Sequence, residues 1–225
     1  MKTIKALYIQ EGIMQKRILC YGDSNTWGAI PNESERYPDD VRWTGVLQNE
    51  LGSTYKVIEE GYNGRTTVHD DPIEGKLSGV TYFKPCMESQ LPLDLIIIML
   101  GSNDLKTRFN VNTKAIASGL YRYKEVMTNA PKMSITPQLL VVAPIHMDPS
   151  YKNHVIFHDM FGEDAVERSL GFAEAFKEVA DGMGAHYFNA ADHAEPSVKD
   201  GLHMDPDSHE KLGKALAEKV REILG

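Results

Sequence analysis

The chain has 225 residues, of which 24 are lysine or arginine and 32 are aspartate or glutamate, giving a net charge of −8. This acidic balance argues against a nucleic-acid partner, because phosphate binding requires clustered basic side chains. The longest apolar run, residues 95–100, is far shorter than the ~20 residues that cross a bilayer, so we expect no membrane partner and a cytoplasmic location.

One folded domain is expected over residues 16–225, because no Ser/Gly/Pro-rich linker, like-charge run or internal repeat divides the chain. Residues 1–15 are interpreted as an N-terminal extension outside the core, since Met14, followed by Gln-Lys-Arg, would also make a sensible start. Whether residues 1–13 are native stays open. The two cysteines, Cys20 and Cys86, are too few for a disulfide scaffold.

Apolar runs and helical patterns alternate along the chain. Five runs predict strands: Arg17–Tyr21, Lys56–Glu60, Leu93–Leu100, Gln138–Ala143 and His186–Asn189. The third and fourth runs lack polar alternation, so both of their faces must be covered, as in central parallel strands. Helical patterns cover Val41–Leu51, Thr113–Asn129, Ala165–Met183 and the residues after Asp205. The alternation predicts an α/β fold, an open sheet with helices on both faces.

The last helix has the clearest signals. Asp205 suits the N-cap and Pro206 the first helical position, while His209 inside this helix is expected at the surface. Two stretches resist assignment, residues 70–91 and 144–163. The second is too apolar for a free loop, so we interpret it as a lid or a subunit contact.

Polar residues follow the predicted strands, and the carboxyl ends of parallel strands are where sites form. A serine, a glycine loop, an amide and an acid–imidazole pair thus meet at one rim, as acyl transfer requires. The four blocks are Gly22-Asp23-Ser24, the loop with Gly64, Gly101-Ser102-Asn103-Asp104 and Asp200-Gly201-Leu202-His203.

Each residue type has a chemical role in that reaction. Ser24 is a poor nucleophile until a base such as His203 takes its proton, and Asp200 could fix the tautomer of that imidazole. The backbone N–H groups of Ser24 and Gly64 and the amide of Asn103 could then stabilise the negative charge of the tetrahedral intermediate.

The four blocks occur in the order and places of the SGNH (GDSL-type) hydrolases, and from about Arg17 to the C terminus the chain resembles their arylesterase/acyltransferase branch. The longer stretches R-Y-P-D-D-V-R-W-T-G-V-L and E-E-G-Y-N-G-R-T-T carry this likeness. The resemblance implies a three-layer α/β/α sandwich with a flavodoxin-like, five-stranded parallel sheet. It also implies the nucleophile Ser24 with its partners Asp200 and His203, and oxyanion donors from Ser24, Gly64 and Asn103.

The resemblance further implies the reaction and its partners. The substrate would be a small aryl or alkyl ester, cleaved through an acyl-Ser24 intermediate, with the acyl group passed to water, an alcohol or peroxide. No metal or organic cofactor is needed, and a homo-oligomer is expected. Some relatives have a bulky apolar residue where this chain has Asn25; Asn25 and Trp27, close to Ser24, are candidate substrate-binding residues.

Two other functions use the same rim. A carbohydrate acetyl esterase would share the machinery and differ only in substrate. A non-catalytic, flavodoxin-like binding module could hold a flavin or phosphate there, although no Gly-x-Gly-x-x-Gly is present and such a module has no use for Asp200 and His203. His154 and His158 lack a third ligand at a recognisable spacing, so no metal site is expected. The sequence leaves open the physiological substrate, the acyl-chain preference, the ratio of transfer to hydrolysis and the oligomer number.

Overall fold

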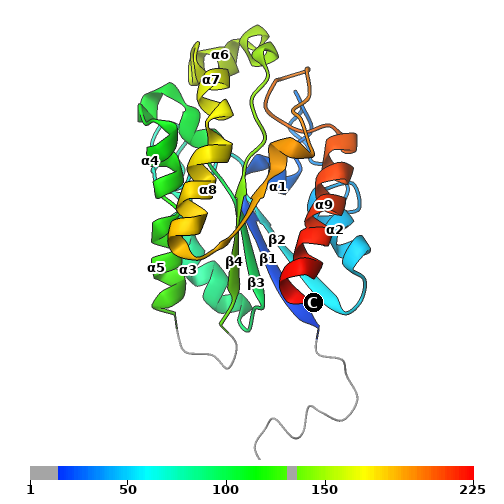
Figure 1. Ribbon diagram of the computed structural model, residues 1–225. Helices are drawn as coiled ribbons and strands as arrows, with labels where there is room; N and C mark the ends of the chain where they lie inside the picture. The colour runs from blue at the N-terminus through cyan, green and yellow to red at the C-terminus, as the bar shows by residue number, and fades with distance from the viewer. Residues whose placement is uncertain (1–14, 131–135) are drawn as a thin grey trace, which may run out of the picture.

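The computed structural model describes residues 15–130 and 136–225, so the interpretation of residues 1–15 as an extension falls outside it except at Gln15. Within these residues five parallel strands form one sheet in the order β2-β1-β3-β4-β5 (Figure 1). The strands are β1 (Lys16–Gly22), β2 (Tyr55–Gly61), β3 (Leu95–Met99), β4 (Gln138–Ala143) and β5 (His186–Asn189). This is the flavodoxin-like order predicted above.

Helices cover both faces of the sheet, and the predicted α/β/α sandwich is confirmed (Figure 1). Strand β3 is buried throughout, and its side chains alternate between two cores. Ile96 and Ile98 pack on the side of α3 (Gly79–Gln90), α4 (Thr113–Ser118), α5 (Tyr121–Thr128), α7 (Ala165–Leu170) and α8 (Phe172–Met183). Leu95, Ile97 and Met99 pack on the side of α2 (Trp43–Leu51) and α9 (Pro206–Leu224).

Two of the predicted helices are each divided. The pattern over 113–129 becomes α4 and α5, and the pattern over 165–183 becomes α7 and α8, with Gly119 and Gly171 at the breaks. Gly119 lies directly against another segment, because a Cβ there would come within 2.9 Å of Thr67 Oγ1. Hydrophobic periodicity continues through such breaks, so it does not reveal them.

The two unassigned stretches contain helices. Residues 70–91 include α3, and residues 144–163 include a 3₁₀ turn (Pro149–Asn153) and α6 (Val155–Phe161). Much of the apolar character of the second stretch is explained by burial, since Tyr151 and Phe161 lie in the core. Among the helices of the described part, none has both the length and the apolar character of a membrane span.

Candidate active site

Ser24 begins the short helix α1 (Ser24–Trp27), separated by one residue from β1, which lies between β2 and β3 in the sheet. The chain turns so tightly there that a Cβ on Gly22 would come within 2.0 Å of Thr26 Oγ1, so only glycine fits. Asp23 caps α1, with its Oδ1 accepting from the Asn25 N–H at 3.0 Å. The hydroxyl of Ser24 is thereby held at the carboxyl edge of the sheet, with the residue 6% exposed.

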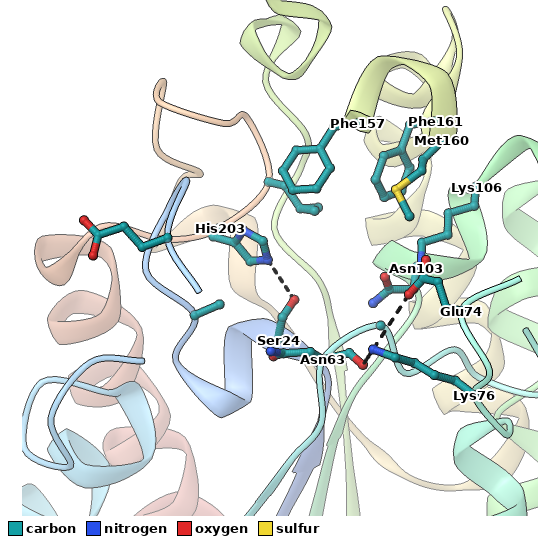
Figure 2. Close-up of a pocket in the computed structure, with 14 residues that line it drawn as sticks. Ser24, Asn63, Glu74, Lys76, Asn103, Lys106, Phe157, Met160, Phe161 and His203 are labelled. Atoms are coloured by element: carbon teal, nitrogen blue, oxygen red, sulfur yellow. Dashed lines mark hydrogen bonds and ion pairs between the residues drawn. The ribbon is translucent and has the colours of Figure 1, made fainter. Parts of the chain in front are cut away.

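A serine, an imidazole and a carboxylate lie in line at this edge. His203 Nε2 is 3.0 Å from Ser24 Oγ, the contact drawn in Figure 2. His203 Nδ1 is 2.7 Å from Asp200 Oδ2. The Ser24–His203 contact joins residues 179 positions apart, because the parallel sheet brings the end of β1 beside the segment before α9. The structure thus brings together the three residues predicted to carry the reaction.

Asp200 is fully buried and accepts several hydrogen bonds. Its Oδ1 receives the N–H groups of Leu202 at 3.0 Å and His203 at 2.9 Å, and its Oδ2 receives the Asn32 N–H at 3.3 Å. Burial alone would raise the pKa of Asp200, but the His203 ring and these N–H groups lower it below its ordinary value. The carboxylate is therefore ionised and fixed beside the imidazole.

The predicted oxyanion donors face the same pocket as Ser24 Oγ. Gly64 has a φ of +75°, and a Cβ there would come within 2.6 Å of Lys76 Nζ, so the position requires glycine. Among the described residues, no hydrogen-bond acceptor is found for the backbone N–H of Ser24 or of Gly64. Asn103 Nδ2 donates one hydrogen to the Arg65 carbonyl at 3.2 Å and has a second one free for a ligand.

Asp104 aligns the two loops that carry these donors. Its carboxylate is fully buried and accepts from the Thr67 N–H at 2.9 Å and from Thr67 Oγ1 at 2.6 Å. Burial raises the pKa of Asp104 to about 7, against the hydrogen bonds from Thr67. Asp23 is buried as well, and burial raises its pKa to about 6. Both carboxyl groups hold the loops through buried hydrogen bonds, and neither lines the pocket.

A pocket of about 180 Å³ opens in front of Ser24 and His203 (Figure 2). Phe157, Met160 and Phe161 of α6 form one wall of the pocket. The interpretation of residues 144–163 as a lid or a subunit contact stays a prediction. A polar wall, missed at the level of sequence, stands away from His203 and contains Asn63, Glu74, Lys76 and Lys106.

The polar wall belongs to a network of ion pairs. Lys106 Nζ lies 2.5 Å from Glu74 Oε1 and 3.7 Å from Asp71 Oδ2, and Arg108 Nη2 lies 2.8 Å from Asp71. Asp71 is 1% exposed and is the buried centre of this cluster. No local pattern signals it, because its partners come from a different loop.

Two candidate substrate-binding residues lie outside the lining of the pocket. The side chain of Asn25 is buried against the backbone of Leu202 and Met204, to which it is hydrogen bonded. Trp27 packs under the guanidinium of Arg36, whose carbon is 4.9 Å from the ring centre. The structure thus gives both residues packing or hydrogen-bonding partners within the protein.

The histidines away from Ser24 have other partners. His154 Nδ1 accepts from the Phe157 N–H at 3.4 Å, and His158 Nε2 lies 2.8 Å from Glu163. In the described residues, no three His, Cys, Asp or Glu side chains are grouped as metal ligands would be.

A parallel α/β sandwich with a serine, an imidazole and a carboxylate aligned at the carboxyl edge of its sheet has the architecture of an acyl hydrolase. The chain belongs to the GDSL-like lipase/acylhydrolase family, whose sequence model matches residues 20–211. It is thus an esterase or acylhydrolase of the SGNH type, acting on small-molecule esters with water.

Solved structures agree with this family. The chain is similar to the aryl esterase of M. smegmatis, with 40% identity and a TM-score of 0.87 over 93% of this chain and 100% of the other. It is also similar to Est24, a carbohydrate acetylesterase from Sinorhizobium meliloti, with 37% identity and a TM-score of 0.88 over 93% of this chain and 100% of the other. No curated protein matches the sequence.

Proposed function

We propose that this protein is a serine esterase that cleaves small aryl or alkyl esters through an acyl-Ser24 intermediate. The observation that carries the proposal is the continuous contact from Ser24 Oγ through the His203 ring to Asp200, over 3.0 Å and 2.7 Å. The likeness to the M. smegmatis aryl esterase supports the aryl-ester part.

The geometry suggests two half-reactions. Ser24 Oγ attacks the ester carbonyl carbon while its proton passes to His203 Nε2, and the carbonyl π electrons move to the oxygen. The N–H groups of Ser24, Gly64 and Asn103 stabilise that oxyanion, which collapses and expels the alcohol with the proton from His203. Water then attacks the acyl-serine by the same route, and the acid and free Ser24 are released.

Another nucleophile can replace water in the second half-reaction. We infer that alcohols or peroxide accept the acyl group, because the wall formed by Phe157, Met160 and Phe161 offers an apolar surface beside the imidazole. When an alcohol is added to the assay, the ester of that alcohol should then form, and chromatography would detect it. Formation of free acid alone, at every alcohol concentration, would contradict this part.

Substitution of the nucleophile tests the proposal directly. Ser24→Ala should abolish turnover of p-nitrophenyl acetate while leaving the circular dichroism spectrum and melting temperature unchanged, since the side chain loses one oxygen. An organophosphonate should label wild-type protein on Ser24 and leave the variant unlabelled. Retained turnover in Ser24→Ala, or label on another residue of active protein, would show the mechanism to be wrong.

A carbohydrate acetyl esterase is the second candidate. The polar wall favours it, because Lys76 and Glu74 offer hydrogen-bond donors and acceptors to hydroxyl groups, and Est24 supports it by similarity. The kcat/KM values for acetylated xylose and phenyl acetate would separate the two candidates: the higher value identifies the preferred substrate class.

A further inference from the structure

The side chain of Asn25 connects the turn that carries Ser24 to the segment that carries His203. Its Nδ2 donates to the Leu202 carbonyl oxygen at 3.1 Å, and its Oδ1 accepts from the Met204 N–H at 3.1 Å. Leu202 and Met204 are the two chain neighbours of His203. A single amide, 3% exposed, therefore holds the residue that bears the imidazole from both sides.

An amide is suited to this position because it has one acceptor and donors on the same short side chain. A carboxylate would turn a second acceptor toward the Leu202 carbonyl oxygen. An apolar side chain would leave two buried backbone groups without partners, which is unfavourable. The N–H group of Met204 needs an acceptor and the carbonyl of Leu202 needs a donor, so they also fix the orientation of the amide, with Oδ1 toward Met204 and Nδ2 toward Leu202.

The other backbone groups near His203 are bonded within their own segment or to segments other than the Ser24 turn, as the Gly201 carbonyl is to the Asp148 N–H at 2.9 Å. The N–H groups of Leu202 and His203 donate to Asp200, and the His203 carbonyl accepts from the Ser197 N–H at 2.7 Å. Across the described residues, the hydrogen bonds between 23–28 and 200–204 are those of Asn25 and the Ser24–His203 contact itself. The amide thus ties the base to the nucleophile independently of the reacting pair.

We propose that Asn25 is a positioning residue that sets the distance and direction of His203 Nε2 relative to Ser24 Oγ. This inference rests on the proposed acyl-Ser24 mechanism. Because Asn25 directly follows Ser24 in the chain, its hydrogen bonds fix the position of the His203 segment relative to the backbone of Ser24. A general base must lie within hydrogen-bonding reach of the proton that it removes, and a displacement of about 1 Å can lower a rate on the order of 10²-fold.

Two substitutions test it, Asn25→Leu and Asn25→Ala. Leucine nearly preserves the side-chain volume and removes both hydrogen bonds, whereas alanine removes the bonds and the volume. Both should lower kcat for p-nitrophenyl acetate by roughly 10- to 100-fold and leave KM within about threefold, because the ester still binds. Labelling of Ser24 by an organophosphonate should slow in parallel with kcat.

Gln48→Leu is the matched control. Gln48 is also an amide that bonds to backbone groups: its Nε2 donates to the carbonyls of Gly52 and Tyr55, each at 3.1 Å, and its Oε1 accepts from the Val57 N–H at 2.8 Å. It joins α2 to β2 and does not line the pocket. Loss of these bonds should lower the melting temperature while kcat stays within about twofold of the wild-type value.

Three results would overturn the inference. The first is a folded Asn25→Leu protein with wild-type kcat. The second is a raised KM with unchanged kcat, which would make Asn25 a substrate contact. The third is failure of both Asn25 variants to fold, which would make the bonds necessary for the fold and not for alignment. If Ser24→Ala were inactive while both Asn25 variants kept the wild-type kcat, the proposed acyl-Ser24 mechanism would stand and only this inference would be wrong.

Discussion

At the scale of single residues, the side chains at the carboxyl edge of the sheet are held mostly by backbone groups, some of the same loop and some of a neighbouring loop. Asp200 accepts from the N–H groups of Leu202 and His203, Asp104 from that of Thr67, and Asn103 donates to the carbonyl of Arg65. Backbone partners move little, so each reacting group is placed before an ester arrives. Such preorganisation is what makes hydrogen bonds to a developing oxyanion effective.

Asn103 is the donor that can be removed without altering the backbone. Asn103→Ala should lower kcat on the order of 10²–10³-fold, because one hydrogen bond to the oxyanion of the transition state is lost. Steady-state kinetics with p-nitrophenyl acetate measure the effect, with KM expected to change little.

Asn112→Ala is the control for this substitution. Asn112 caps α4 through its Oδ1, which accepts from the Ala115 N–H at 2.9 Å, and it lies away from the pocket. Its loss should cost about 1 kcal/mol of stability and no activity. If kcat of Asn103→Ala stayed within about threefold of wild type, Asn103 would be a loop cap and no oxyanion donor.

At the scale of elements, α9 contains a histidine whose position differs from the expectation of surface exposure. His209 is fully buried near the start of α9, where its Nδ1 accepts from the Trp43 N–H at 3.2 Å and its ring packs edge-on against Tyr37. Burial lowers the pKa of His209 to about 4, with the charge of His203 acting in the same direction. The ring is therefore neutral, and it joins α9 to the start of α2.

This histidine should make the protein less stable in acid. The unfolded chain takes up a proton on His209 near pH 6.5 and the folded chain only near about 4. Between these values the unfolded state binds more protons, so the free energy of unfolding falls as pH falls, by about 3 kcal/mol in total. His209→Asn, which can still accept from Trp43, should lose less stability than wild type between about pH 7 and about pH 4.5 in urea titrations.

The exposed His193 gives the comparison for that experiment. His193→Asn should show the pH dependence of the wild type, since this substitution leaves His209 and its contacts in place. Equal losses of stability on acidification in wild type and His209→Asn would mean that His209 does not carry this dependence.

At the scale of the whole molecule, the ion pairs of the described residues differ in how deeply they are buried. Pairs such as Lys152–Glu163 lie on the surface, with the carboxylate side chain 75% exposed. The cluster of Asp71, Glu74, Lys106 and Arg108 is instead sunk between the loops that follow β2 and β3, beside the pocket. Buried charges are costly when a partner is lost, whereas exposed pairs contribute little.

Asp71→Asn should therefore lower the free energy of unfolding by about 3 kcal/mol, because Lys106 and Arg108 would lose a buried counter-charge. Urea-induced unfolding at neutral pH measures this. Glu163→Gln removes a charge from an exposed pair and should leave the urea midpoint close to that of the wild type. Equal effects of the two substitutions would contradict the structural role assigned to the buried cluster.

Much of the architecture follows from local pattern. The runs 138–143 and 186–189 match β4 and β5 in their bounds, and the other strands differ by one or two residues at their ends. The fully apolar run at β3 requires that both faces of the strand be covered by other elements, so this run predicts the three layers of the sandwich. Helix breaks at Gly119 and Gly171 are not readable, because their cause is the close approach of another segment or a change of direction.

The sequence by itself determined the layers, the edge of the sheet where the chemistry lies, and the identity of Ser24, Gly64, Asn103, Asp200 and His203 as the residues gathered there. Apolar periodicity reports which faces are buried, and parallel strands all end at one edge. Only the tertiary structure decided the role of Asn25, the burial of His209 and the charged wall around Asp71. Each of these depends on partners from other segments, up to 179 positions away, and local pattern contains no information on which distant backbone group a polar side chain will meet.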